Sequence, residues 1–148
     1  MNAPSANKRK LKAIASIAAK WYRMNGRRYP WREAANPYQV LVAEILLRKT
    51  QGSRVLPTYT ILMRLYPTPS ALAKAKLEHV RSIVAPLGLP KRAELLRKVA
   101  RKLAASGNEV TSGLDFLEFR GVGQYVANAV DCLAFGKPAP MVEIPEIF

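Results

Sequence analysis

Apolar residues recur at three- and four-residue intervals along most of this 148-residue chain. Between Lys8 and Met24 this spacing, with Lys and Arg in the intervening positions, predicts a basic amphipathic helix. The Asn25-Gly26 pair is a normal helix end, and residues 1–7 are expected to form a disordered tail. The apolar stripe suits either a protein core or a membrane surface. We favour the core because only one short helix shows this pattern.

Similar spacing predicts helices over 37–49, 53–65, 69–75 and 77–84, and one opened by residues 87–93 that runs to Ala105. Asn36 is a suitable N-cap before Pro37 at the first helical position. Pro30 biases the residue before it toward extended geometry, so the segment around Trp31 is expected to be a linker with an aromatic anchor. No stretch alternates as a strand would, and the predicted class is all-α.

Two glycines interrupt the last apolar pattern, at the sequence Arg120-Gly121-Val122-Gly123. Helical spacing on both sides predicts a helix, a tight hairpin and a second helix over residues 112–135. Glycine permits positive φ and close approach of a ligand, so the hairpin amides could face one anion, such as a phosphate. Alternatively, the glycines only end one helix before the next begins.

The charge balance points to a polyanionic partner. Twenty-four Lys and Arg against ten Asp and Glu give a net charge of +14, which makes nucleic acid the first choice. A ribosomal-type structural protein is the alternative, although such proteins usually carry more charge and fewer large aliphatic residues. With Cys132 as the sole cysteine, a disulfide scaffold and a cysteine metal cluster are both excluded within these residues. We expect a cytoplasmic protein, nucleoid-associated in a prokaryote, with no membrane segment.

Glu44 is one carboxylate inside the apolar run Val40 to Leu47. If it is buried, desolvation raises its pKa and lets it hold or pass a proton near neutral pH. The competing interpretation is an i,i+4 ion pair with Arg48 on a partly exposed helix face.

These motifs together resemble the helix-hairpin-helix DNA glycosylases, which include endonuclease III, adenine DNA glycosylases and thymine/uracil mismatch glycosylases. The family pattern L-P-G-V-G-x-[K/S/Y]-T-A, a Gly/Pro loop and an acid correspond to residues 119–143, with Glu143 placed 143 − 125 = 18 residues after Tyr125. A-E-I-L-L-R-K-T-Q around Glu44 and P-W-R around Trp31 also match. The resemblance covers about residues 8–143.

The resemblance implies a six-helix barrel over residues 36–136, with the hairpin at 112–135. Residues 8–35 would be an N-terminal helix and linker of a second domain whose C-terminal part is missing. Residues 137–148 would form a Gly/Pro loop and a truncated catalytic turn.

The same resemblance implies roles for individual residues. Glu44 would assist departure of the base, Glu143 would face the positively charged sugar, and Tyr125 stands where bifunctional relatives carry a Schiff-base lysine. The residues expected to bind DNA are Arg48, Lys49, Gln51, Lys91, Arg92, Arg120, Gly121, Val122, Gly123 and Gln124.

The expected partner is double-stranded DNA, bound by a monomer. The expected reaction is hydrolysis of the N-glycosidic bond of thymine or uracil opposite guanine. The alternatives are adenine opposite guanine or 8-oxoguanine, and a non-catalytic DNA-binding remnant. No metal site is expected. The iron-sulfur cluster of many relatives has no ligands here, and a monovalent cation at the hairpin is the one cofactor that the resemblance allows.

Three departures make turnover doubtful. Glu143 replaces the family's aspartate, Arg120 replaces the hairpin's usual proline, and relatives continue beyond the region matched here. We therefore expect little or no excision by this chain.

Overall fold

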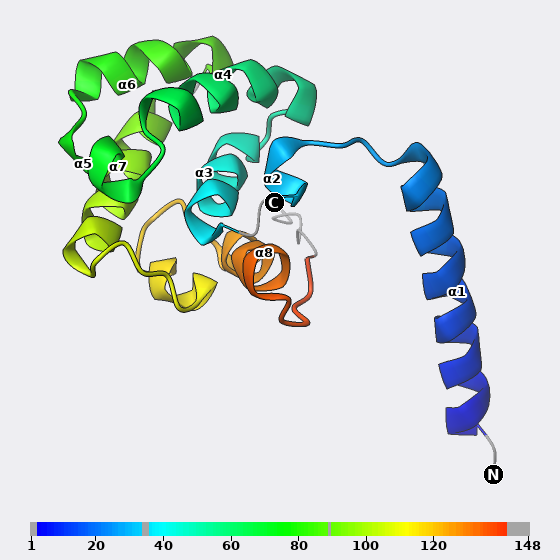
Figure 1. Ribbon diagram of the computed structural model, residues 1–148. Helices are drawn as coiled ribbons and strands as arrows, with labels where there is room; N and C mark the ends of the chain where they lie inside the picture. Colours follow the sequence, from blue (N-terminus) through cyan, green and yellow to red (C-terminus); the bar gives the residue numbers. More distant parts are fainter. Residues whose placement is uncertain (1–2, 34–35, 89, 142–148) are drawn as a thin grey trace, which may run out of the picture.

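The computed structural model describes residues 3–33, 36–88 and 90–141, and within these ranges all regular structure is helical (Figure 1). The prediction of an all-α fold is thus confirmed for the described part of the chain. The elements are α1 Ala3–Asn25, α2 Pro30–Glu33, α3 Pro37–Leu47, α4 Gly52–Leu65, α5 Pro69–Lys74, α6 Leu77–Val84, the 3-10 turn η1 Ala85–Leu87, α7 Lys91–Ala105, the 3-10 turn η2 Gly113–Phe116 and α8 Gln124–Phe135.

Helix α3 is the centre of the fold. Eight of its eleven residues are buried, because its sequence is apolar on every face rather than on one stripe. It packs against α8 on one side and against α2, α4 and α7 elsewhere. The large buried side chains around it include Trp31, Leu62, Leu96 and Phe116.

The start of α3 forms as predicted. The Asn36 side chain accepts hydrogen bonds from the amides of Tyr38, at 3.0 Å, and Gln39, at 3.4 Å. Pro37 occupies the first turn, where its missing N–H costs nothing. This cap fixes where α3 enters the core.

The aromatic anchor is also present, although its backbone differs from the expected linker. Pro30–Glu33 forms the short helix α2, with proline tolerated because it stands at the first position. Trp31 is 1% exposed, stacks on Tyr29 with ring centroids 4.6 Å apart, and meets Tyr59 edge-on at 5.0 Å.

The predicted first helix of the hairpin is wrong. The structure has only the 3-10 turn η2 in its place, followed by irregular turns up to Gly123. The reason is close packing, since a Cβ on Gly113 would collide with the carbonyl oxygen of Ala127 in α8. The second helix, α8, ends at Phe135 as expected, with Gly136 in the left-handed region at φ 63°.

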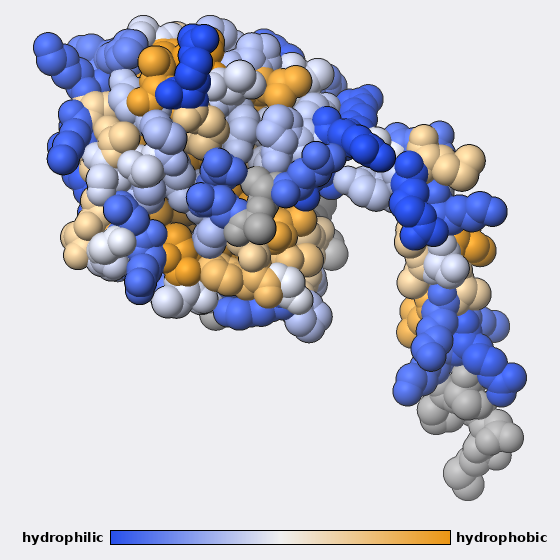
Figure 2. Space-filling model, viewed as in Figure 1, coloured by the Kyte–Doolittle hydropathy of each residue, from blue (hydrophilic) through white to orange (hydrophobic). Residues whose placement is uncertain are grey.

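Helix α1 begins at Ala3, inside the stretch predicted to be a tail, and projects away from the other helices (Figure 1). Its apolar stripe does not face the core. Leu11, Ile14, Ile17 and Trp21 are 61–69% exposed, and apolar side chains are visible along α1 among strongly hydrophilic ones (Figure 2). The core-facing role predicted for this stripe is therefore not seen within the described residues.

Candidate nucleic-acid interface

A groove of about 680 Å³ opens where the end of α3, the start of α7 and the hairpin meet. Its walls carry only cationic, apolar and glycine residues, and no acid. They are Ile45, Arg48, Lys49, Lys91, Arg92, Leu95, Arg120 and Gly121. No ion pair between these cations and an acidic side chain is found among the described residues. Such a surface attracts an anionic polymer, since no acidic side chain among the described residues pairs with these cations.

Six of the residues expected to bind DNA thus come together, although they are spread over more than seventy positions of the sequence. Gln51 and Gln124 are exposed outside the groove lining. Val122 is 4% exposed and packs inward, with its amide donating to the carbonyl of Phe119 at 2.8 Å. Its side chain therefore holds the hairpin to the core and offers no contact surface.

The two hairpin glycines have different roles. Gly121 has φ 111°, in the region that favours glycine, and a Cβ there would come within 2.9 Å of Leu95 Cδ2. Gly123 has an ordinary φ of −92°, is exposed, and has nothing within 4 Å of an added Cβ. Neither backbone strain nor a close neighbour among the described residues requires glycine at 123, which leaves open space in front of the first turn of α8.

The first turn of α8 follows Gly123 directly, and no side chain caps it. Gly123, the residue before this turn, has no side chain that could cap it, and the helix dipole favours negative charge there. The start of α8 therefore lies beside the cationic groove that Gly121 helps to line.

Arg92, which was also expected to contact DNA, lies in the wall of the groove and is directed to the end of α3. The residue is 6% exposed. Its guanidinium donates to the carbonyl oxygens of Leu46, at 2.9 Å, and Arg48, and to Thr50 Oγ1 at 3.0 Å. Burial and the neighbouring Arg48 charge lower the pKa of Arg92. The side chain is thus committed to the end of α3, whose last carbonyls lack helical partners.

Glu44 lies in the core side of α3 with 5% exposure. Burial raises its pKa from 4.5 to about 7, and the Arg32 charge opposes this rise in part. The alternative i,i+4 ion pair is not formed, because Arg48 Nη1 donates to the carbonyl of Gly121 at 2.6 Å. Glu44 can therefore hold or release a proton near neutral pH, which is what a general acid requires.

Tyr125 lies in the first turn of α8, half-buried against the core. Its helix, α8, packs against α3, the helix that carries Glu44. Glu143 lies outside the described residues. The chain leading to it is fastened to α8, since Asn128 Nδ2 donates to the carbonyl of Pro140 at 2.8 Å while Asn128 Oδ1 accepts from Gln124.

Sequence reasoning missed Asp131, a second acid inside an apolar helix. It is 7% exposed and accepts hydrogen bonds from the Gly113 amide at 2.9 Å and from the Ser112 hydroxyl at 3.2 Å. Lys137 Nζ lies 3.7 Å from it. Asp131 ties η2 and the start of the Gly/Pro loop to α8. The sequence did contain a signal for Asp131, because it is an acid that follows the apolar residues Val126, Ala127, Ala129 and Val130. The same kind of signal singled out Glu44.

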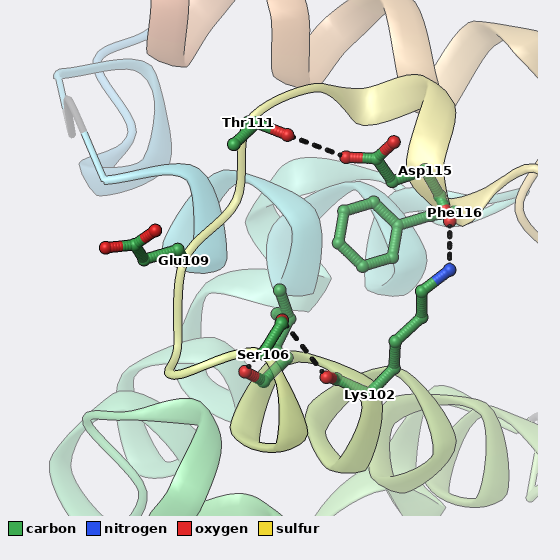
Figure 3. A pocket seen from close by; sticks show the side chains of 7 residues that line it. Lys102, Ser106, Glu109, Thr111, Asp115 and Phe116 are labelled. Carbon is green, nitrogen blue, oxygen red and sulfur yellow. Dashed lines mark hydrogen bonds between the residues drawn. The ribbon is translucent and has the colours of Figure 1, made fainter.

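A second pocket, of about 270 Å³, lies between the end of α7 and η2 (Figure 3). Several of its polar groups pair with one another or with a neighbouring side chain. Lys102 Nζ donates to the carbonyl of Asp115 at 2.7 Å and pairs with Glu118, and Thr111 Oγ1 donates to Asp115 Oδ2 at 3.0 Å. This internal pairing makes the pocket a weaker candidate than the cationic groove.

Metal and membrane sites are absent from the described residues. They contain no group of three or more His, Cys, Asp or Glu side chains that could hold a metal ion. The chain's one cysteine, Cys132, cannot supply the four thiolates of an iron-sulfur cluster. Among the helices described, none combines the length and apolar composition that a bilayer crossing needs.

Comparison with known proteins identifies the family. The model of the HhH-GPD superfamily base excision DNA repair proteins matches residues 42–144. This match spans α3 to the Gly/Pro loop, and therefore includes the groove, the hairpin and the buried Glu44. The chain belongs to this superfamily.

Individual relatives are similar over most of this chain. A thymine/uracil-DNA glycosylase of Pyrobaculum aerophilum is 41% identical over 128 residues, which cover 84% of this chain and 56% of the relative. A thymine-DNA glycosylase of Aeropyrum pernix is 37% identical, covering 93% and 63%. An adenine DNA glycosylase of Mycobacterium tuberculosis is 38% identical, covering 83% and 41%. The chain thus spans less than two thirds of these relatives.

Solved structures agree on the fold. The structure of a thermostable thymine-DNA glycosylase superposes with a TM-score of 0.83 at 33% identity, covering 93% of this chain and 65% of that one. A non-covalent endonuclease III-DNA complex gives a TM-score of 0.72 at 25% identity, covering 89% and 63%. The predicted family and helix-hairpin-helix glycosylase fold are confirmed.

Proposed function

We propose that this protein grips duplex DNA with the cationic groove and the hairpin, and that its chemistry is hydrolysis of the N-glycosidic bond of thymine or uracil opposite guanine. The observation that carries the proposal is the groove itself. Four exposed cations, Arg48, Lys49, Lys91 and Arg120, border a glycine hairpin that opens a helix, and the described lining of the groove contains no acid. Phosphates are the anions that such a combination recognises without reading sequence.

The chemistry follows from what excision demands. A stacked base cannot be reached, so it must leave the duplex before its bond to the sugar is broken. Glu44, with a pKa near 7, would protonate or hydrogen-bond the departing base. Glu143 would stabilise the positive charge that develops on the sugar while water attacks it.

Tyr125 determines the kind of reaction proposed. A lysine at this position could form a covalent imine with the sugar, whereas a phenol cannot. The reaction is therefore monofunctional, ending in a free base and an abasic site. Borohydride added during reaction with an abasic duplex should trap no adduct, and an adduct mapped to a lysine near the start of α8 would overturn this assignment.

Thymine or uracil is the proposed substrate because relatives named for these bases match over the longest stretches of this chain. Adenine opposite guanine or 8-oxoguanine is the second candidate. It is supported by the similarity to adenine DNA glycosylases and by the buried Glu44.

Turnover by the 148-residue chain is proposed to be weak, and a DNA-binding remnant is the alternative. Glutamate at 143 is one methylene longer than the family's aspartate. A misplaced carboxylate loses much of its stabilisation of the transition state. Duplexes containing G:T, G:U or A opposite 8-oxoguanine, followed by alkali, would measure excision. Robust cleavage that Glu143→Gln abolishes would show that the loss is overestimated.

DNA binding is tested separately with Gly123→Val. A side chain fits there in the free protein, so the thermal midpoint should fall only slightly, because valine is a poorer N-cap than glycine. Duplex affinity should fall by about tenfold or more, since the phosphate can no longer approach the amides. Ala105→Val, at the exposed end of α7, is the control for added bulk and should bind normally. If Gly123→Val binds duplex as well as the parent at moderate salt, the hairpin does not bind phosphate, and its glycines only separate two elements.

A further inference from the structure

The connection between α3 and α4 contains a lysine in an unusual conformation. Residues 47–50 form a tight turn closed by a hydrogen bond from the Thr50 amide to the carbonyl of Leu47, at 2.9 Å. Arg48 has φ −53° and ψ 118°, and Lys49 has φ 54°. This is a type II turn, whose third residue is normally glycine or asparagine. Lysine keeps positive φ only where the surroundings hold it.

Arg92 supplies that restraint from α7. Its guanidinium donates to one acceptor just before the turn, the carbonyl of Leu46, and to two within it, the carbonyl of Arg48 and the hydroxyl of Thr50. A planar guanidinium has enough donors in a fixed fork to reach all three, whereas an ammonium is a point charge on a flexible stem. The interaction is sheltered from solvent, because Arg92 is 6% exposed.

Arg48 connects the same turn to the hairpin. Its side chain donates to the carbonyl of Gly121 at 2.6 Å, across 73 positions of sequence. Gly121 is the hairpin residue with φ 111°. One chain of hydrogen bonds therefore joins the Lys49 turn to the hairpin. Arg92 donates to the turn, and Arg48, within the turn, donates to the hairpin.

We propose that Arg92 is a positioning residue for DNA engagement: with Arg48 it locks the Lys49 turn and the hairpin into one preformed surface. The part of this inference that concerns DNA rests on the proposed function, whereas the restraint of the turn does not. Arg92 itself makes no contact with DNA. Arg92 acts through Lys49. It keeps the Lys49 backbone at positive φ, which lysine would otherwise leave, and so keeps Lys49 in the lining of the groove.

The first test compares Arg92→Lys and Arg92→Met with Arg101→Met, which removes an exposed cation from the same helix. Amide exchange at Thr50 should accelerate at least about tenfold in both Arg92 variants, and duplex affinity should fall by a similar factor. Exchange at Leu103, in the buried face of α7, should change much less. Arg101→Met should leave Thr50 protected. If Arg92→Lys binds duplex like the parent, the charge alone matters and the proposal is wrong.

The second test is a double-mutant cycle with Lys49→Gly. Glycine adopts positive φ freely, so it should restore slow exchange at Thr50 in the Arg92→Met background. For duplex affinity, the double variant should lose no more than the larger single loss, because Arg92 acts through Lys49. Additive losses, or an unrestored Thr50 amide, would overturn the proposal. If the parent chain binds no duplex, the proposed function fails while the exchange measurements still decide whether Arg92 restrains the turn.

Discussion

Helices α3 and α1 respond differently to the same hydrophobic effect. α3 is apolar all round and buried on eight of eleven residues, whereas α1 carries a well-formed stripe whose large residues are 61–69% exposed at Leu11, Ile14, Ile17 and Trp21. An apolar pattern with helical period predicts that a helix forms. Whether the stripe is buried depends on a partner surface, and the described residues supply one only for α3.

The cations near the two helices differ in the same way. α1 carries Lys8, Arg9, Lys10, Lys12, Lys20 and Arg23 with no acid, on a helix that projects from the body. The cations at the end of α3 sit on a packed surface, and Arg48 and Arg92 are fixed by hydrogen bonds. Both regions attract a polyanion, but only the second can present its donors in a fixed arrangement.

The largest contrast is expected from matched truncations of the two apolar surfaces. Leu41→Ala removes a side chain that is 1% exposed and should lower the free energy of unfolding by about 2 to 5 kcal/mol. Ile14→Ala in α1 should change it by about 0.5 kcal/mol or less. Urea denaturation of the two variants makes the comparison. Equal losses would mean that the stripe of α1 is buried in solution.

Glu44 provides the next test, because its burial makes stability depend on pH. The pKa rises from 4.5 to about 7 on folding, so the folded state binds the proton more tightly. Stability should be greatest below pH 4.5 as far as this group is concerned, fall between pH 4.5 and 7, and stay low above. Glu44→Gln should abolish that dependence and stabilise the protein at pH 8 by about 3 kcal/mol. Glu33→Gln, an exposed acid in α2, is the control. A parent whose stability is flat over this range would contradict the buried state of Glu44.

The smallest effect is expected from removing residues 1–24. Every described side chain of α1 is exposed, so the remaining helices lose little packing. The free energy of unfolding of the truncated chain should lie within about 1 kcal/mol of the parent. A collapse of cooperative unfolding would show that α1 docks on the body.

Local patterns predicted much of this structure. The bounds of α4, α5 and α6 and the end of α8 agree with the expected ones to within one or two residues, because each depends on local apolar spacing and punctuation. The Asn36 cap and the buried Trp31 followed from short motifs. Glu44 was singled out because a carboxylate inside an apolar run has to be accommodated by its surroundings.

Long-range geometry was not predictable. Arg92 is one of six basic residues in its helix, and nothing local distinguishes the one that reaches Leu46, 46 positions earlier. The replacement of a helix by η2 depends on Gly113 meeting Ala127, another contact between distant positions. The exposure of α1 was missed for the same reason. Apolar periodicity predicts that a helix has an apolar face, but it does not predict which surface, if any, covers that face.

The salt dependence of duplex affinity tests the central claim most directly. Each phosphate contact contributes about −0.9 to the slope of log affinity against log salt concentration. Replacing Lys49, Lys91 and Arg120 together by glutamine should flatten the parent slope by about 2 to 3, and the same replacement of Lys8, Lys12 and Lys20 in α1 by less than about 1. That result would identify the groove as the DNA-binding surface. A larger flattening from the α1 variant would contradict it.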